Sequence, residues 1–259
     1  MADRAAAPGP GPLLVLNGVS FRLGVTLGRP GAPVIHRQCD IVGRSAEVLA
    51  PLVAEVLAEA GVAPRDLGGV ACVRGPGSFT GLRVVLATAL GLSFGAAIPM
   101  AGLDHLPLLA ASAAGQATGV IVAVTHARSA QVYLQTFLAD GDVMPLGPPA
   151  ALFVPDAALR AADAAAVGPL AFVGEGAERH RAVLAAAAPM AAFLGPQFYE
   201  PDPETLLAAA ARADYGFAPI DPLYLRPCDA EENLAAFAAG RGLSAAAAAA
   251  MFHRATTEL

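Results

Sequence analysis

A glycine-rich segment combines the residue types and spacing with the most chemical content: Gly75-Pro-Gly-Ser-Phe-Thr-Gly-Leu-Arg83. The segment matches none of three known glycine motifs. It is not a dinucleotide-binding fingerprint, because Thr80 takes the place of the third glycine, and it is not a Walker A loop, because the lysine is missing. It is not a serine-hydrolase nucleophile elbow either, because Pro76 replaces the first glycine. Glycines permit tight turns, and Ser78 or Thr80 could cap a following helix whose free amides attract anions. Two interpretations stay open, namely a loop that binds an anion or nucleotide and a capped turn without a ligand. The loop would consist of Gly75, Gly77, Ser78, Thr80, Gly81 and Arg83.

Patterns for metal binding and acid–base catalysis are weak along the rest of the chain. The five histidines never fall at i, i+4 with a glutamate between them, so we predict no helical zinc site. Asp104-His105 could supply a base to Ser78, but a loop position explains the pair equally well. The chain contains no lysine, which excludes every mechanism that needs a lysine amine.

Composition and charge argue against disordered, nucleic-acid-binding and disulfide-rich classes of protein. The 259 residues are 56% hydrophobic and 15% charged, whereas a charged share of about 25% is usual, so intrinsic disorder is excluded. A formal net charge of −6 disfavours autonomous binding to nucleic acid. Cys39, Cys72 and Cys228 are odd in number and widely spaced, which predicts neither disulfides nor a zinc cluster and favours a cytoplasmic protein.

Two segments resemble targeting or membrane elements in part. Residues 1–12 have Ala-Pro-Gly sequence instead of an apolar run, so we predict a flexible N-terminus rather than a signal peptide. Residues 84–103 carry no charge and have the length of about 20 residues that a membrane span requires. Thr88, Ser93 and Pro99 favour a buried helix that runs into a strand, and we predict no membrane span.

Hydrophobic periodicity predicts the same order of elements twice. Three strands come first, followed by a helix, a short buried strand, the glycine segment and an apolar helix. Their predicted ranges are Leu13–Leu16, Phe21–Leu27, Val34–Cys39, Ser45–Ala60, Leu67–Val73, Gly75–Gly81 and Leu82–Gly95. The second half has predicted strands at Gly119–Thr125, Gln131–Leu138 and Leu170–Val173, predicted helices at Glu178–Ala188 and Pro203–Ala213, and an Ala-rich tail. The repetition predicts two related halves of mixed α and β structure.

The helix predicted over Ser45–Ala60 has a wide apolar stripe that includes Leu49, Leu52, Val53 and Val56. Core packing alone would explain this stripe. Because the chain has few charges, an exposed apolar face that recruits a partner is the alternative.

Several short motifs carry a resemblance to a known family. They are the glycine segment, Ser45-Ala-Glu-Val-Leu-Ala-Pro-Leu-Val53, Ile98-Pro99, Ala127-Arg-Ser-Ala-Gln-Val-Tyr133, Phe172-Val-Gly-Glu-Gly-Ala177 and Pro222-Leu-Tyr-Leu-Arg226. In this order they resemble the TsaB (YeaZ) family, accessory subunits in the synthesis of threonylcarbamoyladenosine in bacterial tRNA. The glycine motif is the most specific of them.

The resemblance implies an α/β fold of the actin-like, Hsp70-like kind, built from two ribonuclease H-like domains with mixed sheets. It places a flexible N-terminus at residues 1–12, an N-terminal domain at 13–103, a second, smaller domain at 104–229 and an Ala-rich tail at 230–259.

The resemblance also implies a non-catalytic scaffold, not an enzyme, that binds the catalytic subunit TsaD, with the ATPase TsaE joining. This chain would hold no cofactor tightly, since ATP and metal belong to the partner, and would meet tRNA only through the complex. The first two helices of such proteins form the partner face, which here would include Leu49, Leu52, Val53, Val56, Leu82, Val85 and Leu86. A homodimer could form when the chain is alone.

The chain departs from the family pattern at three places. Asn17-Gly18-Val19 stands where the family has an Asp-Thr-Ser turn, Arg44 replaces a histidine and His126 replaces an aspartate. An asparagine is not an anionic ligand for magnesium, so these changes argue against independent nucleotide hydrolysis. Two alternatives remain, a glycoprotease-like (peptidase M22-like) hydrolase and a homodimeric interaction protein with another partner.

Overall fold

The computed structural model describes residues 7–40, 45–128, 130–226, 238 and 244. The chain divides into two compact units, Met1–Leu223 and Tyr224–Leu259. The predicted Ala-rich tail and residues 1–6 of the predicted flexible N-terminus lie outside the described residues, apart from residues 238 and 244. The elements below belong to the first unit.

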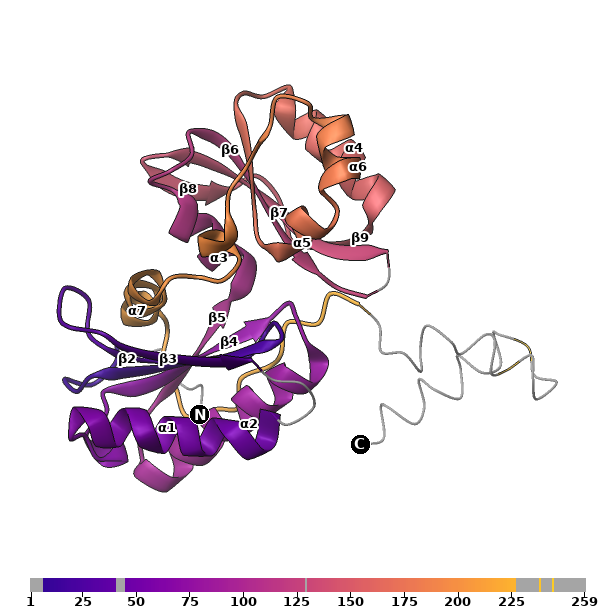
Figure 1. Ribbon diagram of the computed structural model, residues 1–259. Coiled ribbons are helices and arrows are strands. Elements are labelled where there is room, and N and C mark those ends of the chain that lie inside the picture. The colour runs from indigo at the N-terminus through magenta and orange to yellow at the C-terminus, as the bar shows by residue number, and fades with distance from the viewer. Residues whose placement is uncertain (1–6, 41–44, 129, 227–237, 239–243, 245–259) are drawn as a thin grey trace. The chain divides into compact units, whose positions relative to one another are not determined.

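The first sheet has five strands in the order β3-β2-β1-β4-β5 (Figure 1). Their bounds are β1 Leu13–Asn17, β2 Arg22–Gly28, β3 Ile35–Asp40, β4 Gly69–Gly75 and β5 Met100–Asp104. Strands β1, β2 and β3 form an antiparallel meander, whereas β4 runs parallel to β1 and β5 parallel to β4. Parallel neighbours need crossovers. Helix α1 (Ser45–Ala60) with the short helix η1 (Pro64–Asp66) precedes β4, and α2 (Phe79–Ala96) connects β4 to β5.

Helices cover both faces of this sheet, which explains why β1 and β4 are continuous apolar runs. On one face, α1 and α2 pack through Leu49, Val56 and Val85 against Leu16 of β1 and Val70 of β4. The opposite face is covered by α3 (His105–Ala113) and α7 (Pro203–Arg212). The parallel strands are therefore buried on both sides.

The second sheet repeats the plan of the first. Its strand order is β11-β10-β6-β7-β8, and β9 also pairs with β7. The bounds are β6 Gly119–His126, β7 Gln131–Asp140, β8 Asp142–Pro145, β9 Ala150–Phe153, β10 Leu170–Val173 and β11 Ala192–Phe193. The remaining helices are α4 (Val154–Ala165), α5 (Glu175–Arg179), α6 (Arg181–Ala187) and η2 (Pro196–Phe198). Because strands followed by helices recur in this order, the predicted doubled α/β organisation is confirmed.

Most predicted elements lie close to their observed bounds, and the exceptions have local causes. The predicted helix Ser45–Ala60 is confirmed, and it ends where Gly61 adopts a left-handed φ of 64°. The predicted helix Glu178–Ala188 is divided at His180, whose ψ of 21° and φ of −113° interrupt it. Helices α3 and α4 were not predicted. In α3 apolar residues lie on most sides, so that no periodic stripe stands out, whereas α4 has a clear amphipathic pattern built largely from alanine, which the prediction missed.

Two segments differ from the predicted domain boundaries. Helix α7, assigned to the second domain, packs through Leu206 and Leu207 in the cluster that also contains Leu13 and Val15 of β1. The chain then pairs Gly216 with Met100 of β5. At the N-terminus, the Gly9 amide donates to Gly68 O (2.7 Å), and the Gly68 amide to Pro12 O (2.9 Å). Residues 9–12 are therefore held against the segment that leads into β4.

Helix α2, Phe79–Ala96, is long and apolar enough to cross a membrane by length and composition, and no other helix among the described residues passes this test. Its inner side packs against β4 and α1 through Val85 and Ala89. The helix ends at Ala97, which has a left-handed φ of 53° and whose amide bonds to Ser93 O. Helix α2 thus packs on its own sheet with one side, as an outer-layer helix of an α/β domain does.

Candidate functional site

The glycine segment forms the junction between β4 and α2. Strand β4 ends at Gly75, and α2 begins at Phe79, so the predicted loop is shorter than its motif and Thr80 and Gly81 belong to the first helical turn. Ser78 is the N-cap, and its Oγ accepts a hydrogen bond from the Gly81 amide at 3.2 Å. The predicted cap is therefore confirmed at Ser78.

Backbone from the β1–β2 turn fills the space above the glycines. The Ser78 amide donates to Val19 O at 2.7 Å. A Cβ added at Gly77 would lie 2.4 Å from Val19 O, and one at Gly81 would lie 2.0 Å from Gly18 O. These glycines are required because another part of the same chain approaches them closely.

The segment does not fit a phosphate group. Its Ser78 and Gly81 amides are already bonded, and Arg83 stacks over the Phe79 ring at 3.9 Å. Thr80 is exposed on the first turn of α2. Of the two interpretations of the glycine motif, the geometry favours the capped turn, and we derive no nucleotide chemistry from it.

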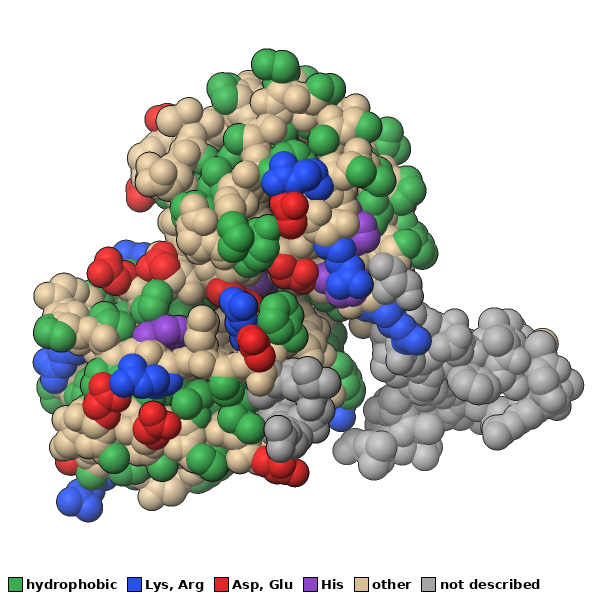
Figure 2. Space-filling view, viewed as in Figure 1, with side chains coloured by type: hydrophobic (Ala, Val, Ile, Leu, Met, Phe, Trp, Pro, Cys, Tyr) green, Lys and Arg blue, Asp and Glu red, His purple; other side chains and the backbone are tan. Residues whose placement is uncertain are grey.

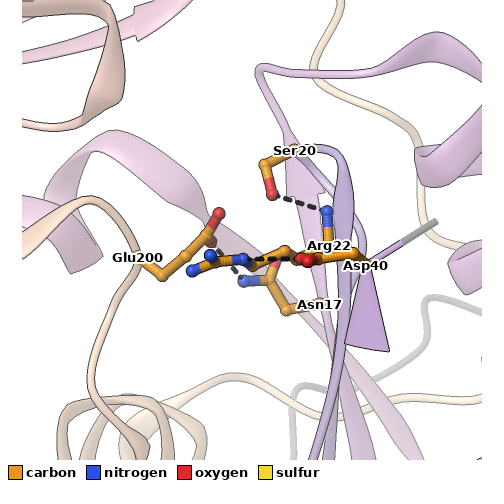
Figure 3. A network of polar contacts seen from close by, with 5 residues as sticks. All are labelled: Asn17, Ser20, Arg22, Asp40 and Glu200. Carbon is orange, nitrogen blue, oxygen red and sulfur yellow. Dashed lines mark hydrogen bonds and ion pairs between the residues drawn. The ribbon is translucent and has the colours of Figure 1, made fainter. Parts of the chain in front are cut away.

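A polar network lies beside this junction (Figure 3). Asn17, the last residue of β1, donates from Nδ2 to Glu200 Oε2 at 3.2 Å. Its Oδ1 accepts from the Val19 amide at 3.3 Å, which shapes the turn that enters the glycine junction. On the neighbouring strands, Arg22 Nε pairs with Asp40 Oδ1 at 2.9 Å. The network thus connects the end of β1 to the segment just before α7.

Glu200 is the half-buried carboxyl of this network, whereas Asp40 is exposed. Burial raises its pKa, while hydrogen bonds from Ser20 and Asn17 and the charge of Arg22 oppose the rise and the charge of Glu175 adds to it. Asn17 is neutral, so Glu200 faces an amide donor instead of a second carboxylate. General acid–base catalysis by carboxylates uses two of them, one as the acid and one as the base, and this network lacks such a pair. Sequence reasoning missed Glu200, because its partner lies 183 residues away.

Replacing Glu200 with glutamine is expected to stabilise the protein at pH 7 by about 1 kcal/mol, the scale of one hydrogen-bonded polar group. A carboxyl whose pKa is higher in the folded than in the unfolded chain favours folding while protonated, and this contribution is lost as pH rises through the folded pKa. The gain of Glu200→Gln over the native chain should therefore shrink toward pH 4. Urea unfolding at both pH values measures it, with exposed Glu204→Gln as the control. An equal gain at both pH values would contradict the assignment.

Most residues predicted as the partner face belong to the core, which corrects the prediction for them, whereas Val53 also lines the groove described below. Leu49, Val53, Val56, Leu82 and Val85 are at most 5% exposed. They pack against the first sheet on the inner side of α1 and α2. Leu52 and Leu86 are partly buried against the same core. A stripe of large apolar residues marks the side of a helix that faces its own sheet.

The outer side of α1 and α2 carries an apolar groove instead. Its volume is about 430 Å³, and Ala50, Ala54 and Ala58 of α1 line it together with Thr88 and Leu92 of α2. The three alanines recur at i, i+4 and i+8, and all three are exposed. Small residues at this spacing were the signal in the sequence that could have identified the groove.

Charged side chains of α1 lie on its side toward β3 and do not line the groove. Arg37 of β3 bonds Glu59 of α1 at 2.6 Å, and Figure 2 shows acidic and basic side chains next to one another over α1 and β3. On α2, Phe94 is 73% exposed, whereas Gly91 and Gly95 leave open space beside the helix. The groove itself is apolar apart from Thr88.

Comparisons with known proteins place the chain among tRNA-modification proteins and their relatives. A family model described as "TsaD: tRNA N6-adenosine threonylcarbamoyltransferase" matches residues 42–211. An uncharacterized protein of Mycobacterium tuberculosis (strain H37Rv) is 36% identical over 186 residues, which are 72% of this chain and 77% of the relative. The tRNA threonylcarbamoyladenosine biosynthesis protein TsaB of Escherichia coli K12 is 38% identical over 92 residues, 35% of this chain and 39% of that protein.

Solved structures give the same result at the level of the fold. An uncharacterized Pseudomonas aeruginosa protein with similarity to peptidase YeaZ matches with a TM-score of 0.69 and 26% identity, over 83% of this chain and 100% of that one. YeaZ from Pseudomonas aeruginosa matches with a TM-score of 0.67 and 24% identity over the same shares. These matches confirm the predicted fold.

Proposed function

Since this chain belongs to the TsaB (YeaZ) branch of the tRNA N6-adenosine threonylcarbamoyltransferase family, we propose that it is a non-catalytic subunit in the synthesis of threonylcarbamoyladenosine in tRNA. In this role it binds the catalytic TsaD subunit through the outer side of α1 and α2. The observation that carries the proposal is the apolar groove between these helices, lined by Ala50, Ala54 and Ala58.

The groove suits a partner that has a helix pair of the same kind. The chain is similar both to TsaB proteins and to the transferase itself, for example 46% identical over 68 residues to the Maricaulis maris enzyme, 26% of this chain and 18% of the enzyme. Two related proteins can pack equivalent helix pairs against each other about a pseudo-two-fold axis. Small residues such as Ala54 and Gly91 let the backbones of such helices come close. TsaD is therefore a better occupant than an unrelated protein.

Two features support a non-catalytic role. Ser78 Oγ caps α2 through a backbone amide, so the hydroxyl serves the fold rather than a nucleophile. Asn17 and Glu200 pair as amide and carboxyl at the end of β1, where a hydrolase of this kind would use carboxylates. ATP, metal and the TsaE ATPase then belong to the assembled complex, and the net charge of −6 leaves tRNA binding to its partners.

Co-expression with the TsaD-type subunit of the same organism tests the proposal, with size-exclusion chromatography and light scattering as the readout. We expect one peak with the mass of a one-to-one or two-to-two complex. Each chain alone gives the reference masses and reveals a homodimer of this chain. Two separate peaks, also after adding ATP, the TsaE-type ATPase and tRNA, would contradict the proposed partner.

A further inference from the structure

Two histidines meet at the carboxyl edge of the second sheet. His126 is the last residue of β6, and His180 lies between α5 and α6. Strands β6 and β10 are parallel neighbours, so the segments that follow them start from the same edge, the place where open α/β sheets bind ligands. The two imidazole centroids are 6.3 Å apart, and the ring planes are tilted by 30°.

Each ring has a buried nitrogen without a partner in the described part of the chain. These atoms are His126 Nδ1 and His180 Nε2. An unsatisfied buried polar atom costs about 1–3 kcal/mol, and most such atoms in proteins are hydrogen-bonded. Two such nitrogens on neighbouring rings are candidates for one shared ligand.

The separation of the rings suits one metal ion. A metal–nitrogen distance of about 2.0–2.1 Å places an ion about 3.2 Å from the centroid of the ring that binds it. Two imidazoles on one ion thus have centroids up to about 6.4 Å apart, and the observed 6.3 Å lies near this limit. A wide nitrogen–metal–nitrogen angle follows, with the other positions open to water.

Burial favours the neutral form of both rings. Burial, assisted by the charge of Arg179, lowers the pKa of His126 and of His180, whereas Glu175 acts in the opposite direction on both. Neutral imidazole is the form that binds metals. Glu175 Oε1 also accepts the His126 amide at 3.0 Å, which fixes the end of β6 beside a negative charge.

We propose that His126 Nδ1 and His180 Nε2 together bind one divalent metal ion that prefers imidazole and accepts ligands on opposite sides, such as Ni²⁺, with water completing the coordination. No group of three or more His, Cys, Asp or Glu among the described residues is arranged to hold a metal. The site therefore has two protein ligands, and we expect a dissociation constant in the micromolar range or weaker.

Calorimetric titration of the untagged, chelator-treated full chain with Ni²⁺ tests the proposal. We expect one saturable site, a loss of affinity of at least about 10-fold in His126→Gln and in His180→Gln, and no saturable binding of Mg²⁺, which prefers oxygen ligands. His36→Gln is the matched control, because His36 Nδ1 already has Thr26 Oγ1 as a partner at 2.9 Å. It should bind Ni²⁺ like the native chain.

A second measurement needs no variant. In NMR spectra of the native chain, paramagnetic Ni²⁺ should broaden the His126 and His180 ring signals before those of His36 or His105. Binding that survives both substitutions, broadening that spares this pair, or no saturable binding at 1 mM Ni²⁺ would each overturn the proposal. In the last case a bridging water satisfies the two nitrogens.

Discussion

Replacing Gly81 with alanine is expected to lower the free energy of unfolding by about 3 kcal/mol, the upper part of the usual range for overpacking. The added Cβ would lie 2.0 Å from Gly18 O. Because the obstacle is backbone rather than the end of a flexible side chain, either the β1–β2 turn or the start of α2 has to move. The Ser78 amide bond to Val19 O would be lost in the process. Urea unfolding followed by circular dichroism measures the change.

Gly91→Ala in the same helix is the matched control. A Cβ at Gly91 meets no atom within 4 Å, so this substitution should stabilise the chain by about 1 kcal/mol through helix propensity alone. Gly81 would gain the same propensity, and the difference between the two variants isolates the contact with the turn. Equal stability of both variants would show that the turn moves aside at little cost.

The glycine segment shows how far a motif can be interpreted from sequence. Its spacing located the strand–turn–helix junction and the cap at Ser78 correctly. A glycine indicates that other atoms approach the backbone closely, but the spacing of glycines does not show whether these atoms belong to a phosphate or to another part of the chain. Here the approaching atoms belong to Gly18 and Val19, and this long-range contact has no local signature.

The partner face illustrates a different limit. Periodicity located α1 within its observed bounds, because large apolar residues at helical spacing identify the buried side. The same property made Val56 a poor candidate for binding a partner, since it packs on the chain's own sheet, whereas Val53 packs there and also lines the groove. The exposed alanines were not recognised, because alanine contributes little to any apolar pattern.

Contacts between segments that are distant in the sequence could not be predicted from sequence patterns. Helix α7 was predicted, but its position against β1 depends on tertiary packing of Leu206 and Leu207. Asn17 was noticed only as a departure from a family pattern, whereas its bond to Glu200 gives the asparagine a structural role. His126 was likewise noticed as a replacement, and the position of His180 beside it required the fold.

Ala54→Arg is expected to weaken binding of the TsaD-type subunit by about 100-fold, the loss typical of a strong interface position. Ala54 is exposed in the middle of the α1–α2 groove, so an arginine there both fills the groove and places a charge in an apolar contact. The isolated chain should keep its stability within about 0.5 kcal/mol, as is usual at exposed positions. Calorimetry or surface plasmon resonance with the purified partner gives the affinity.

Two further substitutions separate binding from folding. Ala165→Arg adds the same side chain at an exposed position of α4, over the second sheet, and should leave the affinity unchanged. Val56→Glu also lies on α1, but Val56 is fully buried, so this variant should lose binding only by unfolding, because an unpaired buried charge is too costly for the core. If Ala54→Arg binds like the native chain while Ala165→Arg does not, the partner docks on the second sheet's helices and the groove of α1 and α2 has another role.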